Sequence, residues 1–138
     1  MRVLVSACLL GRNCKYNGGN NYNERVAAFV KDKEVIAYCP EVMAGMGIPR
    51  TPIEIVGGVL MDRNRNNVDE AMREAVRRAL EEIGKLDVDC AVLQSRSPTC
   101  GVNQVYDGTF SGKLIEGQGI FAKALMNAGI RVIDAEDV

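Results

Sequence analysis

The sequence predicts a small three-layer α/β domain with a mostly parallel sheet and an inserted β-hairpin. Two observations support this prediction. Short apolar runs rich in β-branched residues alternate with amphipathic helical segments, and such runs are typical of strands that are covered on both faces. A chain of 138 residues suits one folding unit, so we expect a single α/β domain over residues 1–138.

The predicted elements follow one another in regular order. Strands are expected at residues 2–7, 34–39, 89–94 and 130–135, and helices at 23–32, 67–84 and 119–129. Asn67 and Glu70 form a variant of the capping box at the start of the long helix. Residues 53–61 contain two β-like runs around a Gly-Gly pair, which predicts the inserted hairpin.

Composition limits the classes of partner. Hydrophobic residues make up 47% and charged residues 25%, with a net charge of −1, which argues against nucleic acid or a membrane surface as a partner. The N-terminal apolar run is broken by Ser6, so we interpret it as a strand and not as a signal peptide. We expect a cytoplasmic protein whose thiols stay reduced. The sequence does not define an oligomeric state.

Five cysteines are present, and their positions give the clearest functional signal. Their odd number and irregular spacing do not suit a disulfide framework. Cys8, Cys39 and Cys100 each come at or just after the end of a predicted strand, and the carboxyl ends of parallel strands meet at one edge of a sheet. We therefore expect these three to converge, and Cys14 could join them. Cys90 lies within a predicted strand and is interpreted as a structural cysteine.

Three or four convergent cysteines allow several chemistries. The chain has no C-x-x-C pair, which a structural zinc site normally shows. It also has no histidine to activate a nucleophilic thiol. An iron–sulfur cluster suits thiolate ligands on glycine-rich loops best. Zinc, thiol redox chemistry and plain packing remain the alternatives at this point.

Three sequence blocks then point to a known family. The blocks "SACLLGRNCKYNGG", "YCPEVMAGMGIPRTPIEI" and "SRSPTCG…YDGTFSG…GQGIFAKAL" resemble the domain of unknown function 523 family, over nearly the whole chain. One branch of that family contains thiouracil desulfidases that depend on a [4Fe-4S] cluster. Serine is frequent in the family where this chain has Thr99, a change that keeps the hydroxyl.

The resemblance implies a function and a set of site residues. In the desulfidases three cysteines hold the cluster, and they match Cys8, Cys39 and Cys100. One iron is left free and takes up the sulfur of a thiolated base, while water replaces sulfur at carbon without net redox change. Glu41 and Ser97 match the candidate proton-transfer groups. The resemblance thus implies a [4Fe-4S]-dependent desulfidase acting on a small thiolated base such as thiouracil.

Each remaining candidate has a second interpretation. Cys14 is a possible fourth ligand, a resolving thiol or an ordinary loop residue. Glu41 could be a solvated or helix-capping carboxylate, and Ser97 could simply shape its turn. Arg50 lies between two prolines. One expectation is that it binds an anion or a substrate base, and the alternative is that it is a solvated loop residue.

Two further expectations concern the aromatic residues and the class of function. The segment "YDGTF" carries an Asp-Gly turn signal. Tyr106 and Phe110 within it are expected in the core, with stacking on a base as the alternative. The alternative function is a non-catalytic metal- or cluster-binding protein in sulfur handling or tRNA thiolation.

Overall fold

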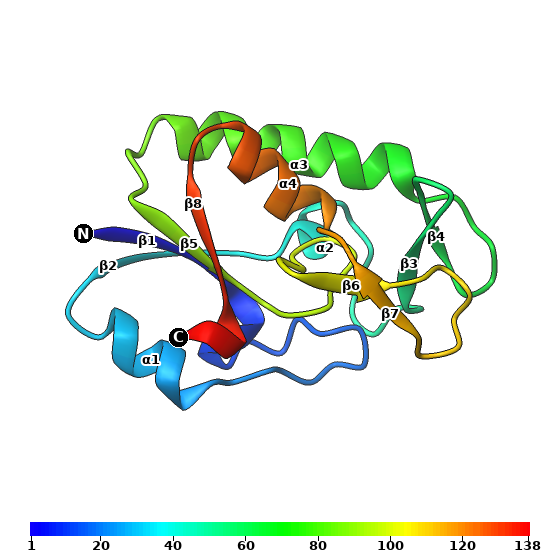
Figure 1. Cartoon of the computed structure of the whole chain (residues 1–138), viewed down its shortest axis with the longest axis horizontal. Helices are drawn as coiled ribbons and strands as arrows, with labels where there is room; N and C mark the ends of the chain where they lie inside the picture. Colours follow the sequence, from blue (N-terminus) through cyan, green and yellow to red (C-terminus); the bar gives the residue numbers. More distant parts are fainter.

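Four parallel strands form the central sheet of the computed structural model, which describes all 138 residues (Figure 1). The strands are β1 (Arg2–Ser6), β2 (Glu34–Tyr38), β5 (Cys90–Leu93) and β8 (Arg131–Asp134). Their order in the sheet is β2-β1-β5-β8, and every neighbouring pair is parallel. All four lie where the apolar runs predicted strands, and each boundary agrees within one residue.

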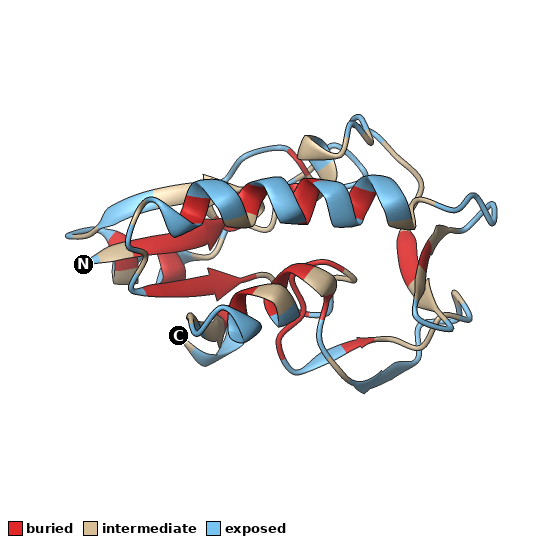
Figure 2. Cartoon of the chain, turned by 90° about the horizontal axis from the view of Figure 1, so that it is seen from above, coloured by how far each residue is buried: buried red, intermediate tan, exposed pale blue.

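Helices cover both faces of this sheet, as a three-layer fold requires. Helix α1 (Glu24–Val30) packs on one face, against Val3 and Val92. Helices α3 (Asp69–Gly84) and α4 (Ile120–Asn127) pack on the other, against Leu4 and Leu93. Buried and exposed residues alternate along α3, and the central strands β1 and β5 are almost wholly buried (Figure 2). No helix has both the length and the apolar character needed to cross a bilayer.

Three short helical elements were not predicted. They are the 3₁₀ helix η1 (Ala7–Leu10), the single-turn helix α2 (Pro40–Met43) and the terminal η2 (Ala135–Asp137). The first two directly follow β1 and β2 at the carboxyl edge of the sheet. They therefore place the residues after these strands near one another.

Two antiparallel hairpins lie beyond that edge (Figure 1). The predicted one pairs β3 (Ile53–Val56) with β4 (Val59–Asp62). Its turn residues Gly57 and Gly58 both have positive φ, 57° and 84°, as a type I′ turn requires. The second pairs β6 (Gln104–Tyr106) with β7 (Leu114–Glu116), and the Asp-Gly turn signal falls in their connection.

The predicted capping box at α3 is wrong. Val68 is the N-cap residue, and the Oδ1 of Asn67 accepts the Asp69 N–H at 2.9 Å in a local turn of the kind that Asn favours. Asp69 Oδ1 in turn accepts the N–H of Leu60 at 3.1 Å. The helix start is therefore tied to strand β4 and not closed by its own third residue.

Candidate functional site: a cysteine-lined pocket

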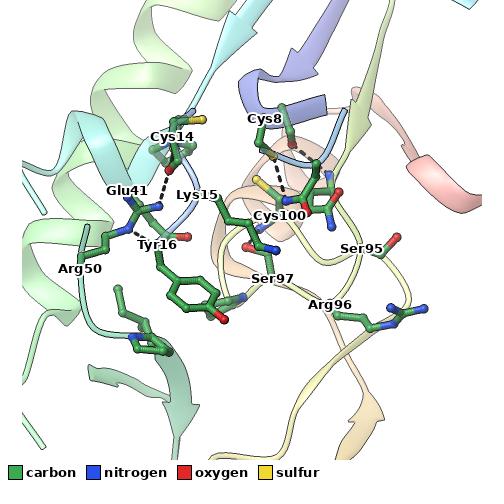
Figure 3. Close-up of a pocket in the computed structure, with 18 of the residues that line it drawn as sticks. Cys8, Cys14, Lys15, Tyr16, Glu41, Arg50, Ser95, Arg96, Ser97 and Cys100 are labelled. Carbon is green, nitrogen blue, oxygen red and sulfur yellow. Dashed lines mark hydrogen bonds and ion pairs between the residues drawn. The ribbon is translucent and has the colours of Figure 1, made fainter. Parts of the chain in front are cut away.

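The pocket lies at the point where the strand order of the sheet reverses. The chain leaves β1 for β2 on one side and later returns to β5 on the other side of β1. Loops that follow two such strands diverge and leave a crevice at their carboxyl ends. A pocket of about 530 Å³ opens here, and Cys8, Cys14, Cys39 and Cys100 all line it. Figure 3 shows the labelled side chains around this hollow.

The expected convergence of three strand-end cysteines is found. Cys8 lies in η1 directly after β1, and Cys39 lies between β2 and α2. Cys100 lies in the loop between β5 and β6 and is 6% exposed. Cys8 and Cys39 are half-buried, so their thiol groups remain within reach of the pocket.

The other two cysteines differ from each other. Cys14 lines the pocket, and its carbonyl oxygen faces the Cys39 Sγ at 4.0 Å. Cys90 is the first residue of β5, where it packs beneath α1 and does not line the pocket. The structural interpretation of Cys90 is thus confirmed by its placement.

Burial is the main influence on the thiol groups. It raises the pKa of Cys39 to about 11 and that of Cys100 well above its usual value. Burial also raises the pKa of Cys8, although a hydrogen bond from Asn21 Nδ2 to Cys8 Sγ acts in the opposite direction. The thiols stay protonated unless a cation accompanies them, so a metal group that binds here must displace their protons.

Glu41 faces the same thiols and is held from two sides. Its negative charge contributes to the raised pKa of all three strand-end cysteines, with burial the larger cause in each case. Arg50 Nε donates to Glu41 Oε1 at 3.0 Å, and Thr99 Oγ1 donates to Oε2 at 3.3 Å. The carboxylate is therefore fixed in orientation at the pocket wall and is not a solvated surface group.

Arg50 is more buried, and has more hydrogen-bond partners within the protein, than the sequence suggested. Its side chain is 6% exposed. Besides Glu41 it binds the carbonyl oxygens of Cys14, at 2.7 Å from Nη2, and Gly47, at 3.1 Å from Nη1. Three of the five guanidinium N–H groups thus have protein partners. Arg50 still lines the pocket, so the expectation that it binds substrate remains a prediction.

Ser97 shapes the loop that carries Cys100. Its Oγ accepts the backbone N–H groups of Thr99 and Cys100, both at 3.1 Å. The carbonyl oxygens of this loop accept N–H groups from the start of α4. Gly119 allows this close approach, because a Cβ there would lie 2.3 Å from the Thr99 carbonyl carbon. Helix α4 therefore supports the Cys100 loop directly.

Several residues of the pocket were missed by sequence reasoning. Lys15 and Tyr16 follow Cys14, and their side chains extend into the space between Arg50 and Ser97 (Figure 3). Arg96 also lines the pocket and pairs with Glu136. The position of Lys15, next to a candidate cysteine, was the only available signal for it.

The expectation that Tyr106 and Phe110 belong to the core is wrong. Both side chains are half-buried and line the pocket. The reason is the second hairpin, which carries this segment out of the central sheet and over the carboxyl edge. Low aromatic content alone could not reveal that placement.

The donor set fits a cluster better than a single ion. The chain has no histidine, so soft ligands must be thiolates. No group of three or more cysteine, aspartate or glutamate side chains is arranged to hold one metal ion, and a zinc site needs thiolates about 2.3 Å from the metal. Three thiols spread around a hollow suit a larger group with several metal atoms. The absence of histidine and of a C-x-x-C pair favours the cluster over the zinc alternative.

The fold and the pocket together define an α/β protein with a cysteine-lined centre suited to an iron–sulfur cluster. The sequence matches the 2-thiouracil desulfurase family over residues 3–137, and the chain belongs to this family. Its relative in Bacillus subtilis (strain 168), the uncharacterized protein YbbK, is 34% identical over 146 residues, which cover 99% of this chain and 97% of YbbK.

A solved structure agrees with the sequence match. It is that of a [4Fe-4S]-dependent thiouracil desulfidase, TudS, of the DUF523 group. The TM-score is 0.92 at 29% sequence identity, and the match covers 99% of this chain and 92% of TudS. The α/β fold class and the family resemblance inferred from the three sequence blocks are both confirmed.

Proposed function

We propose that the protein removes sulfur from a thiolated pyrimidine such as thiouracil, with a [4Fe-4S] cluster held by Cys8, Cys39 and Cys100. The observation that carries this proposal is the convergence of these thiols with Glu41 on one pocket, in a chain of the 2-thiouracil desulfurase family. The similarity to the TudS desulfidase supports the same cofactor. Water replaces sulfur at carbon, so the products are the oxo-pyrimidine and sulfide, and no electrons are exchanged.

The cysteines supply the ligands, and the cluster supplies the electrophile. With Cys8, Cys39 and Cys100 as its ligands, the cluster would offer an iron without a protein ligand as a Lewis acid toward the substrate sulfur. The protonated thiols described above lose their protons as the cluster binds. The alternative is that Cys14, which lines the same pocket, supplies a fourth ligand.

Glu41 is the general base of this proposal. Arg50 and Thr99 each bind one carboxylate oxygen, and each oxygen keeps a further lone-pair site free. A water molecule held there loses a proton to Glu41 while its oxygen bonds to the carbon that carries the sulfur. The carboxylate needs no reorientation for this step, because its two partners already fix it.

Ser97 is the second proton-transfer group. Its Oγ already accepts two backbone N–H groups, so its own O–H is what remains for an external partner. That hydroxyl can donate to a ring nitrogen or oxygen of the pyrimidine. Arg50 is the other candidate contact for the pyrimidine, because two N–H groups of its guanidinium have no protein partner.

The test begins with anaerobic reconstitution and a measurement of iron and acid-labile sulfide per chain. Conversion of 2-thiouracil to uracil is then followed together with the sulfide released. Glu41→Gln should keep the cluster and lose turnover, since an amide cannot take up the proton. Glu70→Gln, on the exposed face of α3, is the matched control and should behave as wild type.

Two outcomes would contradict the proposal in different ways. Turnover by Glu41→Gln within twofold of wild type would remove Glu41 as the base. A wild-type protein that holds the cluster and leaves thiouracil intact would favour the alternative, a non-catalytic cluster-binding protein in sulfur handling.

A further inference from the structure

Aromatic side chains gather around the pocket. The chain has four tyrosines, three phenylalanines and no tryptophan, and four of these seven residues line the pocket, namely Tyr16, Tyr38, Tyr106 and Phe110. Among them only Phe110 has no polar atom in its side chain. A flat apolar surface of this kind is a good partner for a planar ring.

The backbone of Phe110 has an unusual conformation. Its φ is 56°, in the left-handed region that bulky residues rarely adopt. Such conformations persist where the surrounding structure imposes them, and they are frequent at ligand-binding sites. Residues that hold Phe110 in this conformation should therefore be identifiable.

Glu54 of strand β3 is the main such residue. It is only 8% exposed, and its Oε1 accepts the N–H of Gly108 at 3.0 Å and the N–H of Phe110 at 3.2 Å. A charged acceptor makes both hydrogen bonds strong. One buried carboxylate therefore joins the connection of the second hairpin to the first hairpin.

Two features near Phe110 reinforce this anchor. A Cβ on Gly108 would lie 2.5 Å from the carbonyl oxygen of Ile55, so the connection rests directly on β3. Asp107 Oδ1 also accepts both the N–H and the hydroxyl of Thr109, at 3.0 and 2.6 Å. Contacts within the protein therefore hold the backbone around Phe110 in place.

We propose that Phe110 is a specificity-determining residue that stacks on the ring of the thiolated pyrimidine, and that Glu54 is the positioning residue that holds it. The inference rests on the proposed function, since it takes a thiolated pyrimidine as the substrate. It adds that the pocket selects planar aromatic thio-compounds over open-chain compounds with the same thiocarbonyl group.

Binding measurements test the stacking role. Equilibrium dialysis of 2-thiouracil and of thiourea, which has the same N–C(=S)–N unit without the ring, separates ring recognition from sulfur recognition. Phe110→Leu should weaken thiouracil binding about tenfold, the size expected when one base–aromatic stack is lost. Binding of thiourea should not change. Tyr22→Leu replaces an aromatic residue that is 56% exposed and outside the pocket, and it should change neither affinity.

Kinetics test the positioning role of Glu54. Glu54→Gln keeps a carbonyl oxygen that can accept both backbone N–H groups, so KM should stay within about twofold of wild type. Glu54→Ala should raise KM for thiouracil as Phe110→Leu does, with kcat and iron content little changed. A merely structural role for Glu54 would lower iron content and kcat together.

The outcomes separate this inference from the proposed function. If wild type desulfurates thiouracil and Phe110→Leu binds thiouracil as tightly as wild type does, the inference is overturned and the proposed function stands. If Phe110→Leu loses the preference for thiouracil over thiourea but wild type does not turn thiouracil over, the inference is supported and the proposed function is overturned. A wild-type protein that binds neither thiouracil nor thiourea overturns both.

Discussion

Arg50 Nε donates to Glu41 Oε1 across 3.0 Å, and the two side chains are 6% and 17% exposed. The same guanidinium donates to the carbonyl oxygen of Cys14 at 2.7 Å. One cation therefore joins the proposed base to the loop that follows the first cysteine ligand. A buried ion pair with additional hydrogen bonds is strongly affected when one partner is changed, so the consequences of substituting Arg50 should be clear.

Arg50→Lys should slow turnover while leaving iron content unchanged. A lysine keeps the positive charge but cannot serve three acceptors in the plane of a guanidinium, so Glu41 would lose its fixed orientation. We expect kcat to fall roughly ten- to hundredfold, as a small misplacement of a catalytic group does. Arg78→Lys, on the exposed side of α3, is the control. An unchanged kcat in Arg50→Lys would show that Glu41 does not depend on the guanidinium.

Cys100 and Cys90 form a matched pair for testing the cluster ligands. Both are 6% exposed, so replacing either by alanine removes a similar buried thiol. Cys100→Ala should abolish iron and acid-labile sulfide after anaerobic reconstitution. Cys90→Ala should retain the full complement of both, because Cys90 is the first residue of β5 and does not line the pocket at the carboxyl edge of the sheet. Equal cluster loss in the two variants would point to general destabilisation and not to ligation.

Cys14→Ala should keep the cluster. The contacts by which Cys14 holds Arg50 and faces Cys39 include its main chain, since its carbonyl oxygen accepts from Arg50 at 2.7 Å and lies 4.0 Å from the Cys39 Sγ. Alanine retains that carbonyl group. Iron content and visible absorption after reconstitution measure the result. Complete loss of iron in Cys14→Ala, with a normal far-ultraviolet spectrum, would instead make Cys14 a ligand.

The sequence predicted the sheet and the convergence of the cysteines because both follow from local signals. Apolar runs mark parallel strands, and residues that follow such strands meet at one edge. The contacts that complete the site are not local: Thr99 and Glu41 lie 58 positions apart, yet they share a hydrogen bond. The placement of Phe110 likewise depends on Glu54, which is 56 positions away. Side-chain contacts of this kind require the three-dimensional arrangement.

Gly119→Ala should destabilise the fold and disturb the Cys100 loop. A Cβ at this position would lie 2.3 Å from the Thr99 carbonyl carbon, and backbone atoms must move to relieve the overlap. Overpacking of this kind costs about 1–3 kcal/mol. Gly84→Ala is the control, since nothing lies within 4 Å of its added Cβ and alanine favours the helix by up to ~0.5–1 kcal/mol.

Urea unfolding of both glycine variants measures these effects, and iron content after reconstitution reports on the loop. Equal stabilities for Gly119→Ala and wild type would mean that α4 can move away from the Thr99 carbonyl at no cost. In that case the support of the Cys100 loop by α4 would be weaker than the close approach indicates.

Asp69 should make the stability of the fold depend on pH. Burial tends to raise the pKa of its carboxyl group, but hydrogen bonds from Arg73 and from the Leu60 N–H outweigh burial and hold the pKa below its ordinary value. A group with a lowered folded pKa stabilises the protein above its unfolded pKa, about 3.9, and this contribution is lost as the pH falls through the folded value. The ionised Asp69 carboxylate therefore stabilises the fold fully at neutral pH, and this stabilisation is lost in acid.

Asp69→Asn tests this dependence directly, because an asparagine can still accept the Leu60 N–H but cannot pair with the charge of Arg73. We expect the variant to be about 0.5–1 kcal/mol less stable than wild type at pH 7, the size of a partly exposed ion pair. The difference should narrow as the pH falls below about 4. Urea unfolding at pH 7 and pH 3 measures it, with Asp87→Asn on the exposed loop before β5 as control. A difference that stayed constant between the two pH values would show that the carboxylate charge plays no part.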